Sequence, residues 1–116
     1  MNVNTDLKNI LKELSEKAKL MGAFYISQDG SIIDHFFRES VNLNSLPENL
    51  SKIIQNSKEL GILIGNESFK QIIAELDNNT ILLSKITDAR YLILILTRKS
   101  ILHGIIDPYL EYLKNF

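Results

Sequence analysis

The most constraining feature of the sequence is an uninterrupted apolar run near its C-terminal end, Arg-Tyr-Leu-Ile-Leu-Ile-Leu-Thr over residues 90–97. A strand with one face in water alternates apolar and polar residues, and this run does not alternate. It is also far too short to cross a bilayer, which takes roughly 20 apolar residues. The run therefore predicts a central β-strand covered on both faces, so helices are expected on both sides of a sheet.

The N-terminal part supplies a helix and a hairpin for such a sheet. Apolar residues recur at steps of three and four from Leu7 to Met21, which predicts an amphipathic helix that ends at Gly22. Strands are expected at 23–27 and 31–38. They flank the pair Asp29-Gly30, and these two residue types tolerate the positive φ angles of a tight hairpin turn.

A second helix and two more strands follow. Ser45-Leu46-Pro47-Glu48 has the spacing of a capping box with Pro in the first turn, so a helix is predicted to begin here and to end at Gly61 or Gly65. Strands are expected at 68–76 and 80–86, with Asp77-Asn78-Asn79 turning between them.

The chain is expected to end in a third amphipathic helix that starts at about Ser100 and contains Pro108. Pro108 would oppose the carbonyl of Gly104, so the sequence predicts a local kink, or two short helices broken at Asp107. The predicted order is α-β-β-α-β-β-β-α. It corresponds to an α/β (α+β) fold in which a five-stranded sheet carries helices on both faces.

Composition limits the classes of partner and compartment. A chain of 116 residues fits one domain, predicted to span residues 1–116. Its formal net charge of -1 offers no general attraction for nucleic acid or anionic membrane, and it has no Cys for a disulfide framework or thiolate site. With no signal-peptide pattern at the N-terminus either, a cytoplasmic protein without membrane insertion is expected.

No catalytic, cofactor-binding or metal-binding pattern is present in the sequence. The spacing of the five glycines gives no phosphate-binding loop, and no His-Glu-x-x-His spacing or carboxylate cluster completes a metal shell. The chain is therefore predicted not to be an enzyme. Turn formation, helix capping, charge pairing or surface exposure explains the residues weighed for such roles: Asp29, Asp34, His35, His103, Ser45, Ser51, Ser100, Arg38, Arg90 and Arg98.

Two features indicate self-association instead. The strand expected at 68–76 would lie at a sheet edge, where only the charges of Lys70 and Glu75 would oppose pairing with another chain. Phe69, Gln71 and Ile73 are therefore candidate dimer contacts. An edge shielded by a loop or helix is the alternative. In the second helix, Ser57 and Gly61 place two small residues four positions apart on one side of the helix. Another backbone can approach closely there, either the sheet beneath or a helix of a second subunit.

The opening of the chain resembles the roadblock (dynein light chain) family. Met21-Gly22 followed by Ala23-Phe24-Tyr25-Ile26-Ser27-Gln28-Asp29-Gly30-Ser31-Ile32-Ile33 is similar to that family's helix, strand and polar-Asp-Gly turn. The later elements follow in the family's order and lengths. The resemblance implies a longin-like fold with strand order 2-1-5-4-3, the second helix on one face and the other two helices on the opposite face.

The resemblance also implies a function. In roadblock homodimers the third strands join into one sheet and the second helices pack side by side. In prokaryotic relatives similar to gliding-motility regulators, this platform engages a small Ras-like GTPase. A homodimer, or a dimer with a related roadblock subunit, is then expected to present four partner-binding residues on the second helix: Lys52, Gln55, Asn56 and Glu59.

Two alternatives remain open. A structural adaptor would tether other proteins without affecting GTP hydrolysis, as in dynein light-chain assemblies. A small-molecule enzyme or sensor on a profilin-like sheet would need a polar pocket with convergent titratable groups, which the sequence does not indicate.

Overall fold

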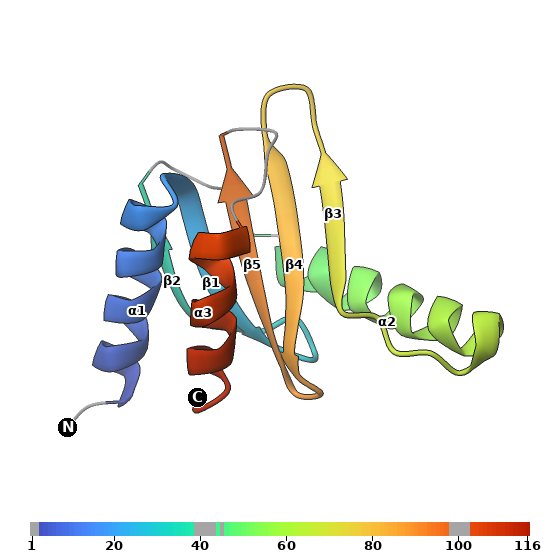
Figure 1. Ribbon diagram of the computed structural model, residues 1–116. Helices are drawn as coiled ribbons and strands as arrows, with labels where there is room; N and C mark the ends of the chain where they lie inside the picture. The colour runs from blue at the N-terminus through green and yellow to red at the C-terminus, as the bar shows by residue number, and fades with distance from the viewer. Residues whose placement is uncertain (1–2, 39–43, 45, 98–102) are drawn as a thin grey trace.

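The computed structural model describes residues 3–38, 44, 46–97 and 103–116 of the chain. Three helices and five strands are formed by these residues (Figure 1). In chain order they are α1 (Val3–Lys17), β1 (Leu20–Ser27), β2 (Ile32–Phe37), α2 (Leu46–Gly65), β3 (Gln71–Glu75), β4 (Thr80–Thr87), β5 (Arg90–Leu96) and α3 (His103–Leu113). The predicted order of elements is confirmed.

The five strands form one antiparallel sheet in the order β2-β1-β5-β4-β3. The apolar run of residues 90–97 provides β5, which lies in the middle of the sheet between β1 and β4, as predicted. Helices α1 and α3 lie on one face and α2 lies on the other (Figure 1). β2 and β3 are the two edges.

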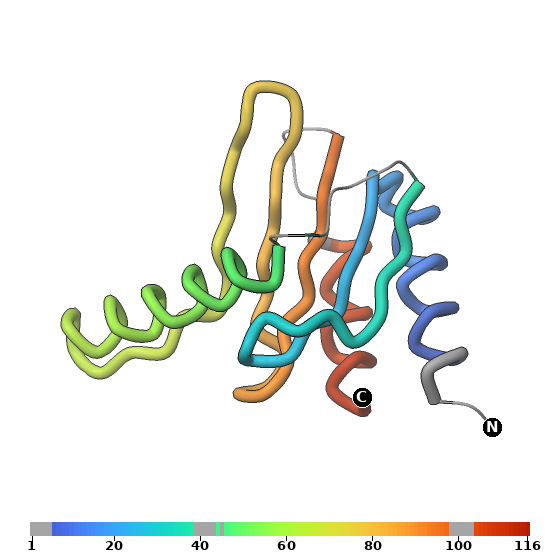
Figure 2. The backbone as a smooth tube through the Cα atoms, turned by 180° about the vertical axis from the view of Figure 1, so that it is seen from behind, coloured from blue at the N-terminus to red at the C-terminus, as the bar shows by residue number. Residues whose placement is uncertain are grey.

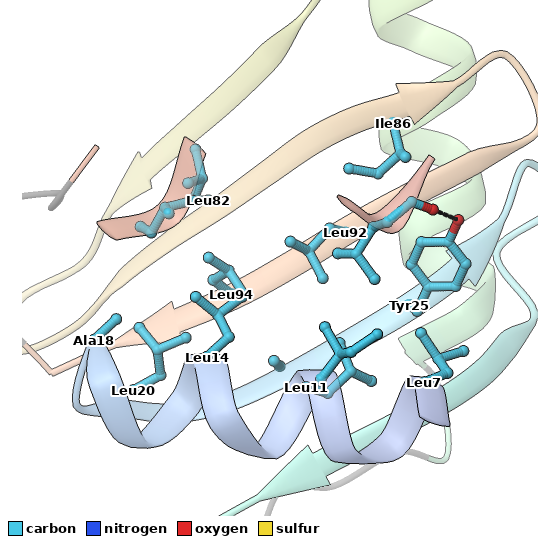
Figure 3. Packing of buried hydrophobic residues seen from close by; sticks show 14 of the residues in the cluster. Leu7, Leu11, Leu14, Ala18, Leu20, Tyr25, Leu82, Ile86, Leu92 and Leu94 are labelled. Carbon is cyan, nitrogen blue, oxygen red and sulfur yellow. Dashed lines mark hydrogen bonds between the residues drawn. The ribbon is translucent and has the colours of Figure 1, made fainter. Parts of the chain in front are cut away.

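Alternate side chains of β5 enter two separate clusters, which explains why this strand has no polar alternation. Leu92 and Leu94 face α1 and α3, where the larger cluster packs (Figure 3), while Tyr91 and Ile93 face α2. The Tyr25 hydroxyl donates a hydrogen bond of 3.1 Å to the carbonyl at the end of α3, so α3 is tied to the sheet.

The turn between β1 and β2 lies against the start of α2. Gly30 has a φ of 88°, which favours glycine, and a Cβ here would lie only 2.1 Å from the Pro47 carbonyl oxygen. Asp29 accepts hydrogen bonds from the Ser27 hydroxyl and, at 3.0 Å, from the Ser31 N–H. The predicted Asp-Gly turn is therefore confirmed, and it lies close against the first turn of α2.

The predicted end of the first helix is wrong. α1 ends at Lys17, and Lys19 takes a left-handed conformation with a φ of 54° that turns the chain into β1. Met21 and Gly22 belong to β1, where the Phe37 ring leaves no room for a side chain at Gly22: a Cβ there would lie 2.3 Å from Phe37 Cδ1. Glycine permits this ring to cover the strand and does not stop the helix.

Helix α3 is continuous through Pro108, so the alternative of two helices broken at Asp107 is wrong. Gly104 stands four residues earlier, but a Cβ added there would meet nothing within 4 Å, so side-chain crowding at this position does not require a glycine. The predicted start at Ser100 and the predicted cap at Ser45 lie outside the described residues.

Candidate protein-interaction surface

Strand β3 forms an open edge of the sheet. Two backbone hydrogen bonds show which β3 residues direct their N–H and C=O groups toward β4. They run from Lys85 N to Lys70 O (2.9 Å) and from Leu76 N to Asn79 O (2.7 Å). Since the facing pattern alternates, Gln71, Ile73 and Glu75 direct their N–H and C=O groups away from the sheet. Within the described part of the chain, no side chain bonds to these groups, and Ile73 is 49% exposed.

Phe69 does not belong to this edge. β3 begins at Gln71, not at Ser68 as predicted, so Phe69 precedes the strand. Its half-buried ring stacks on Tyr91, with ring centroids 5.8 Å apart and an interplanar angle of 12°. Of the three candidate edge contacts, the structure places Gln71 and Ile73 on the open edge and Phe69 against the core.

Helix α2 runs past this edge. Its N-terminal half is anchored on the sheet by the buried Leu50 and Ile54, and its C-terminal half extends beyond β3 (Figures 1 and 2). There Leu60 is 58% and Ile64 is 66% exposed. Beside the open strand, therefore, stands a helix end whose apolar side chains have no sheet beneath them.

Gly61 lets the chain's own backbone approach α2 closely. A Cβ on Gly61 would lie 2.0 Å from the Glu67 carbonyl oxygen, and Glu67 N donates to Gly61 O at 2.9 Å. After the left-handed Asn66, with a φ of 58°, the chain folds back along α2. Within the chain, it is thus the backbone of Glu67 that approaches Gly61, while Ser57 lies half-buried at the edge of a shallow hollow next to β3. The role of Ser57 and Gly61 as dimer contacts stays a prediction.

An apolar hollow of about 300 Å³ lies between α2 and the sheet, and it was missed from the sequence. Only apolar atoms are exposed on its walls. The signals that could have indicated it are the small Ala74 in a strand of larger residues and the apolar Ile53 at the margin of the helix. Residues from several elements line it, among them Leu46, Ile53, Ile72, Ala74, Ile81 and Ile95.

The four predicted partner-binding residues are all exposed on the outward face of α2. Lys52 pairs with Glu48 at 3.3 Å, and Gln55 Nε2 donates to Glu59 at 3.4 Å. Exposed pairs of this kind contribute little to stability, so these side chains are available to another molecule. Their role as contacts stays a prediction, as does that of Asn56.

Four of the residues weighed for chemistry, Asp29, Asp34, His35 and Arg90, have structural partners in the described chain. The His35 backbone N–H donates to Asp34 at 2.8 Å, and its carbonyl accepts from Lys8 at 2.8 Å. Asp29 is bound by its own turn, and Arg90 donates to the neighbouring Ala89 carbonyl. Ser45, Ser100, Arg98 and the His103 side chain lie outside the described residues.

The described residues offer neither a metal shell nor a membrane span. Among them, no three His, Asp or Glu side chains gather closely enough to hold a metal ion. None of the helices, within the same residues, combines the length and apolar character needed to cross a membrane.

No family model matches the sequence, and no curated protein matches it either. Solved structures do match it over nearly its full length. MglB of Myxococcus xanthus superposes with a TM-score of 0.82 at 17% identity, covering 98% of this chain and 96% of that one. The gliding protein MglB of Thermus thermophilus gives 0.79 at 14% identity, with 99% and 91% covered. A roadblock/LC7 domain of Streptomyces avermitilis gives 0.76 at 14% identity, with 93% and 94% covered.

Similarity at these identities is a similarity of backbone path rather than of side chains. The matched structures share the arrangement described above, and the predicted resemblance is confirmed at the level of the fold. The chain has the fold of MglB and the roadblock/LC7 domain.

Proposed function

We propose that this chain is a non-catalytic homodimeric module that binds and regulates a small Ras-like GTPase through α2. The observation that carries the proposal is the juxtaposition of an open β3 edge with an apolar helix end that runs past it. An unpaired edge strand is a template for pairing with another chain, and exposed apolar helix faces are characteristic of protein interfaces.

A two-fold pairing of β3 has one register in which all outward groups are used. Gln71, Ile73 and Glu75 face outward, so a symmetric antiparallel pair centred on Ile73 places Ile73 opposite its copy. Gln71 then stands opposite the Glu75 of the second copy, and the amide can donate to the carboxylate. This register would make one continuous sheet from the two copies.

The same symmetry accounts for the hollow on the α2 face. In the proposed dimer the C-terminal half of α2 crosses the seam and lies over the sheet of the second copy. Its Leu60 and Ile64 would then meet the apolar hollow bounded by Ile53 and Ala74. Covering apolar surface with apolar surface in both directions would stabilise the dimer.

The outward face of α2 remains available in such a dimer and carries Lys52, Gln55, Asn56 and Glu59. By the resemblance to gliding-motility regulators, we assign this face to a small Ras-like GTPase. In this proposal the platform acts by ordering residues of the GTPase, and the module itself contributes no reacting group.

The test combines mass and binding. Light scattering should give twice the monomer mass, and the small Ras-like GTPases of the source organism, loaded with GDP or with a non-hydrolysable GTP analogue, should include one that binds. That GTPase should also hydrolyse GTP at a changed rate. Binding of a non-GTPase partner with hydrolysis unaffected would favour the adaptor alternative, and a monomer at micromolar concentration would contradict the dimer.

A further inference from the structure

The last full turn of α2 is apolar on every side. Residues 60–64 read Leu-Gly-Ile-Leu-Ile, and this run covers more than one complete turn of an α-helix. A helix segment that is apolar all round is normally buried all round. Each side of this turn therefore needs a covering group.

The chain and the proposed second copy cover only part of this turn. The backbone of Glu67 covers the side of Gly61. Leu60 and Ile64 line a hollow of about 260 Å³ that reaches Gln71 and Ile72 beside the open edge, so the second copy would cover them.

Leu63 faces a different direction. It follows the buried Ile54 by nine residues, which is about two and a half helical turns, so the two side chains lie on opposite sides of α2. At 82% it is the most exposed large apolar side chain in the described chain. A copy that joins at β3 lies beside and beneath α2, and it leaves this outward side open.

We infer that Leu63 is the apolar anchor with which α2 holds its GTPase partner, an inference that rests on the proposed function. Lys52, Asn56, Glu59 and Leu63 are separated by four, three and four residues, so they form one stripe. The partner should present an apolar depression for Leu63 and polar groups for the rest. Sequence patterning missed Leu63 because its spacing belongs to the polar stripe.

The charge around this stripe favours a protein over a lipid surface. Glu48, Lys52 and Glu59 contribute two negative charges and one positive charge to the outward face. Helices that lie on membranes carry basic residues on the polar face, which is the opposite balance.

The experiment compares three variants of the full chain with the wild type. Leu63→Gln replaces the anchor by a polar residue with good helix propensity, and Leu63→Met keeps it apolar. Leu60→Gln alters the neighbouring side that faces the second copy. Mass is measured by light scattering, and affinity is measured by titration with the GTPase that binds the wild-type protein.

The expected result separates the two sides of the helix. Leu63→Gln should stay dimeric and bind the GTPase at least about tenfold more weakly, because the burial of one Leu side chain is lost. Leu63→Met should bind nearly as the wild type does. Leu60→Gln should shift the mass toward the monomer.

Several outcomes would overturn the inference. Unchanged GTPase binding by Leu63→Gln removes Leu63 as the anchor and leaves the proposed function standing. If no GTPase binds the wild-type dimer, the proposed function fails and the inference fails with it. A wild-type tetramer that Leu63→Gln reduces to a dimer, or binding to phosphatidylserine vesicles that the same variant abolishes, assigns Leu63 to another occupant.

Discussion

The two edges of the sheet differ in how their outward backbone groups are treated. On β2, Arg38 N donates to Met21 O of β1, and backbone bonding to β1 alternates along the strand from this pair. The N–H and C=O of His35 therefore point outward, away from the sheet. Asp34 accepts from that N–H, and Lys8 of α1 donates to that carbonyl and pairs with Asp34 at 2.9 Å. β2 is thus closed by two side chains at its centre.

On β3, the corresponding groups of Ile73 have no such cover within the described residues, and Ile73 itself is apolar. Both edge strands contain a carboxylate, Asp34 in β2 and Glu75 in β3, but of the two only Asp34 is seen to bond to an outward backbone group in the described residues. A side chain bonded to the outward backbone groups, as on β2, is one way in which a protein prevents an edge strand from pairing. The difference is that side chains cap the outward backbone groups at the centre of β2, whereas within the described residues those at the centre of β3 are left open.

The largest effect should come from blocking the open edge at its centre. Ile73→Pro removes an outward N–H and places a ring where the second copy would pair, but it breaks no bond to β4. The dimer dissociation constant should rise at least about 100-fold with the fold retained. Light scattering over a concentration series measures the dissociation constant, and circular dichroism checks that the fold is retained.

Ile72→Pro is the matched control, since the backbone of Ile72 faces β4. This variant should lose stability as well as the dimer, because a ladder hydrogen bond within the protein is removed. Equal loss of fold in both variants would contradict the assignment of outward and inward residues. A dimer that survives Ile73→Pro would place the seam elsewhere.

The second effect should come from opening the closed edge. Asp34→Ala removes both the acceptor for His35 N–H and the partner of Lys8, and should lower the free energy of unfolding by about 1–3 kcal/mol. With a second edge exposed, species larger than the dimer should form as concentration rises. Denaturant unfolding and light scattering measure the two consequences.

Asp34→Asn provides the control because the amide oxygen still accepts from His35 N–H while the ion pair is lost. It should associate no further than the wild-type protein. If the Ala and Asn variants associate equally, the cap is not what keeps β2 from pairing.

This closed edge also shows what sequence could not predict. Lys8 donates to the His35 carbonyl although the two residues are separated by 27 positions in the sequence. No local sequence pattern predicts that a lysine in a helix will bond to the carbonyl of a distant strand. The sheet order and the central place of β5 were predictable, since hydrophobic periodicity and the resemblance to roadblock domains both constrain them. The end of α1 was not, because it depends on one left-handed residue, Lys19.

The candidate interaction surface was predictable to a similar degree. Exposure of the polar face of α2 follows from helical spacing, and Ile73 follows from the edge position of its strand. The role of Gly61 depends on the path of the chain beyond the end of the helix, and Leu63 and the apolar hollow depend on where α2 lies relative to the sheet. These features depend on tertiary packing, which residue spacing alone does not predict.

A third prediction concerns the helix beside the open edge. Gly→Ala in a helix usually stabilises by about 1 kcal/mol, and at Gly104, with open space around it, this gain is expected. At Gly61 the added methyl meets the Glu67 carbonyl, so Gly61→Ala should instead destabilise by about 1–2 kcal/mol. Thermal unfolding of the two variants should shift in opposite directions, and a stabilising Gly61→Ala would contradict the close approach.

The smallest effect should come from the turn that holds β2 in register. The Ser27 hydroxyl, followed by Ser31, lowers the pKa of the exposed Asp29 carboxyl from its ordinary 3.8 to about 2. Because the folded-state pKa is lowered, this charge stabilises the fold above about pH 4, and the contribution is lost as pH falls toward 2.

Asp29→Asn keeps a residue suited to turns but cannot ionise. The wild-type protein should therefore exceed this variant in melting temperature by a small amount that is constant above about pH 5 and shrinks between about pH 4 and 2. The lowered pKa of Asp88, which Lys85 causes, is common to both proteins and cancels in the difference. A difference that does not change with pH would show that the carboxylate charge contributes nothing to holding this hairpin, and that backbone pairing to β1 alone keeps the closed edge in register.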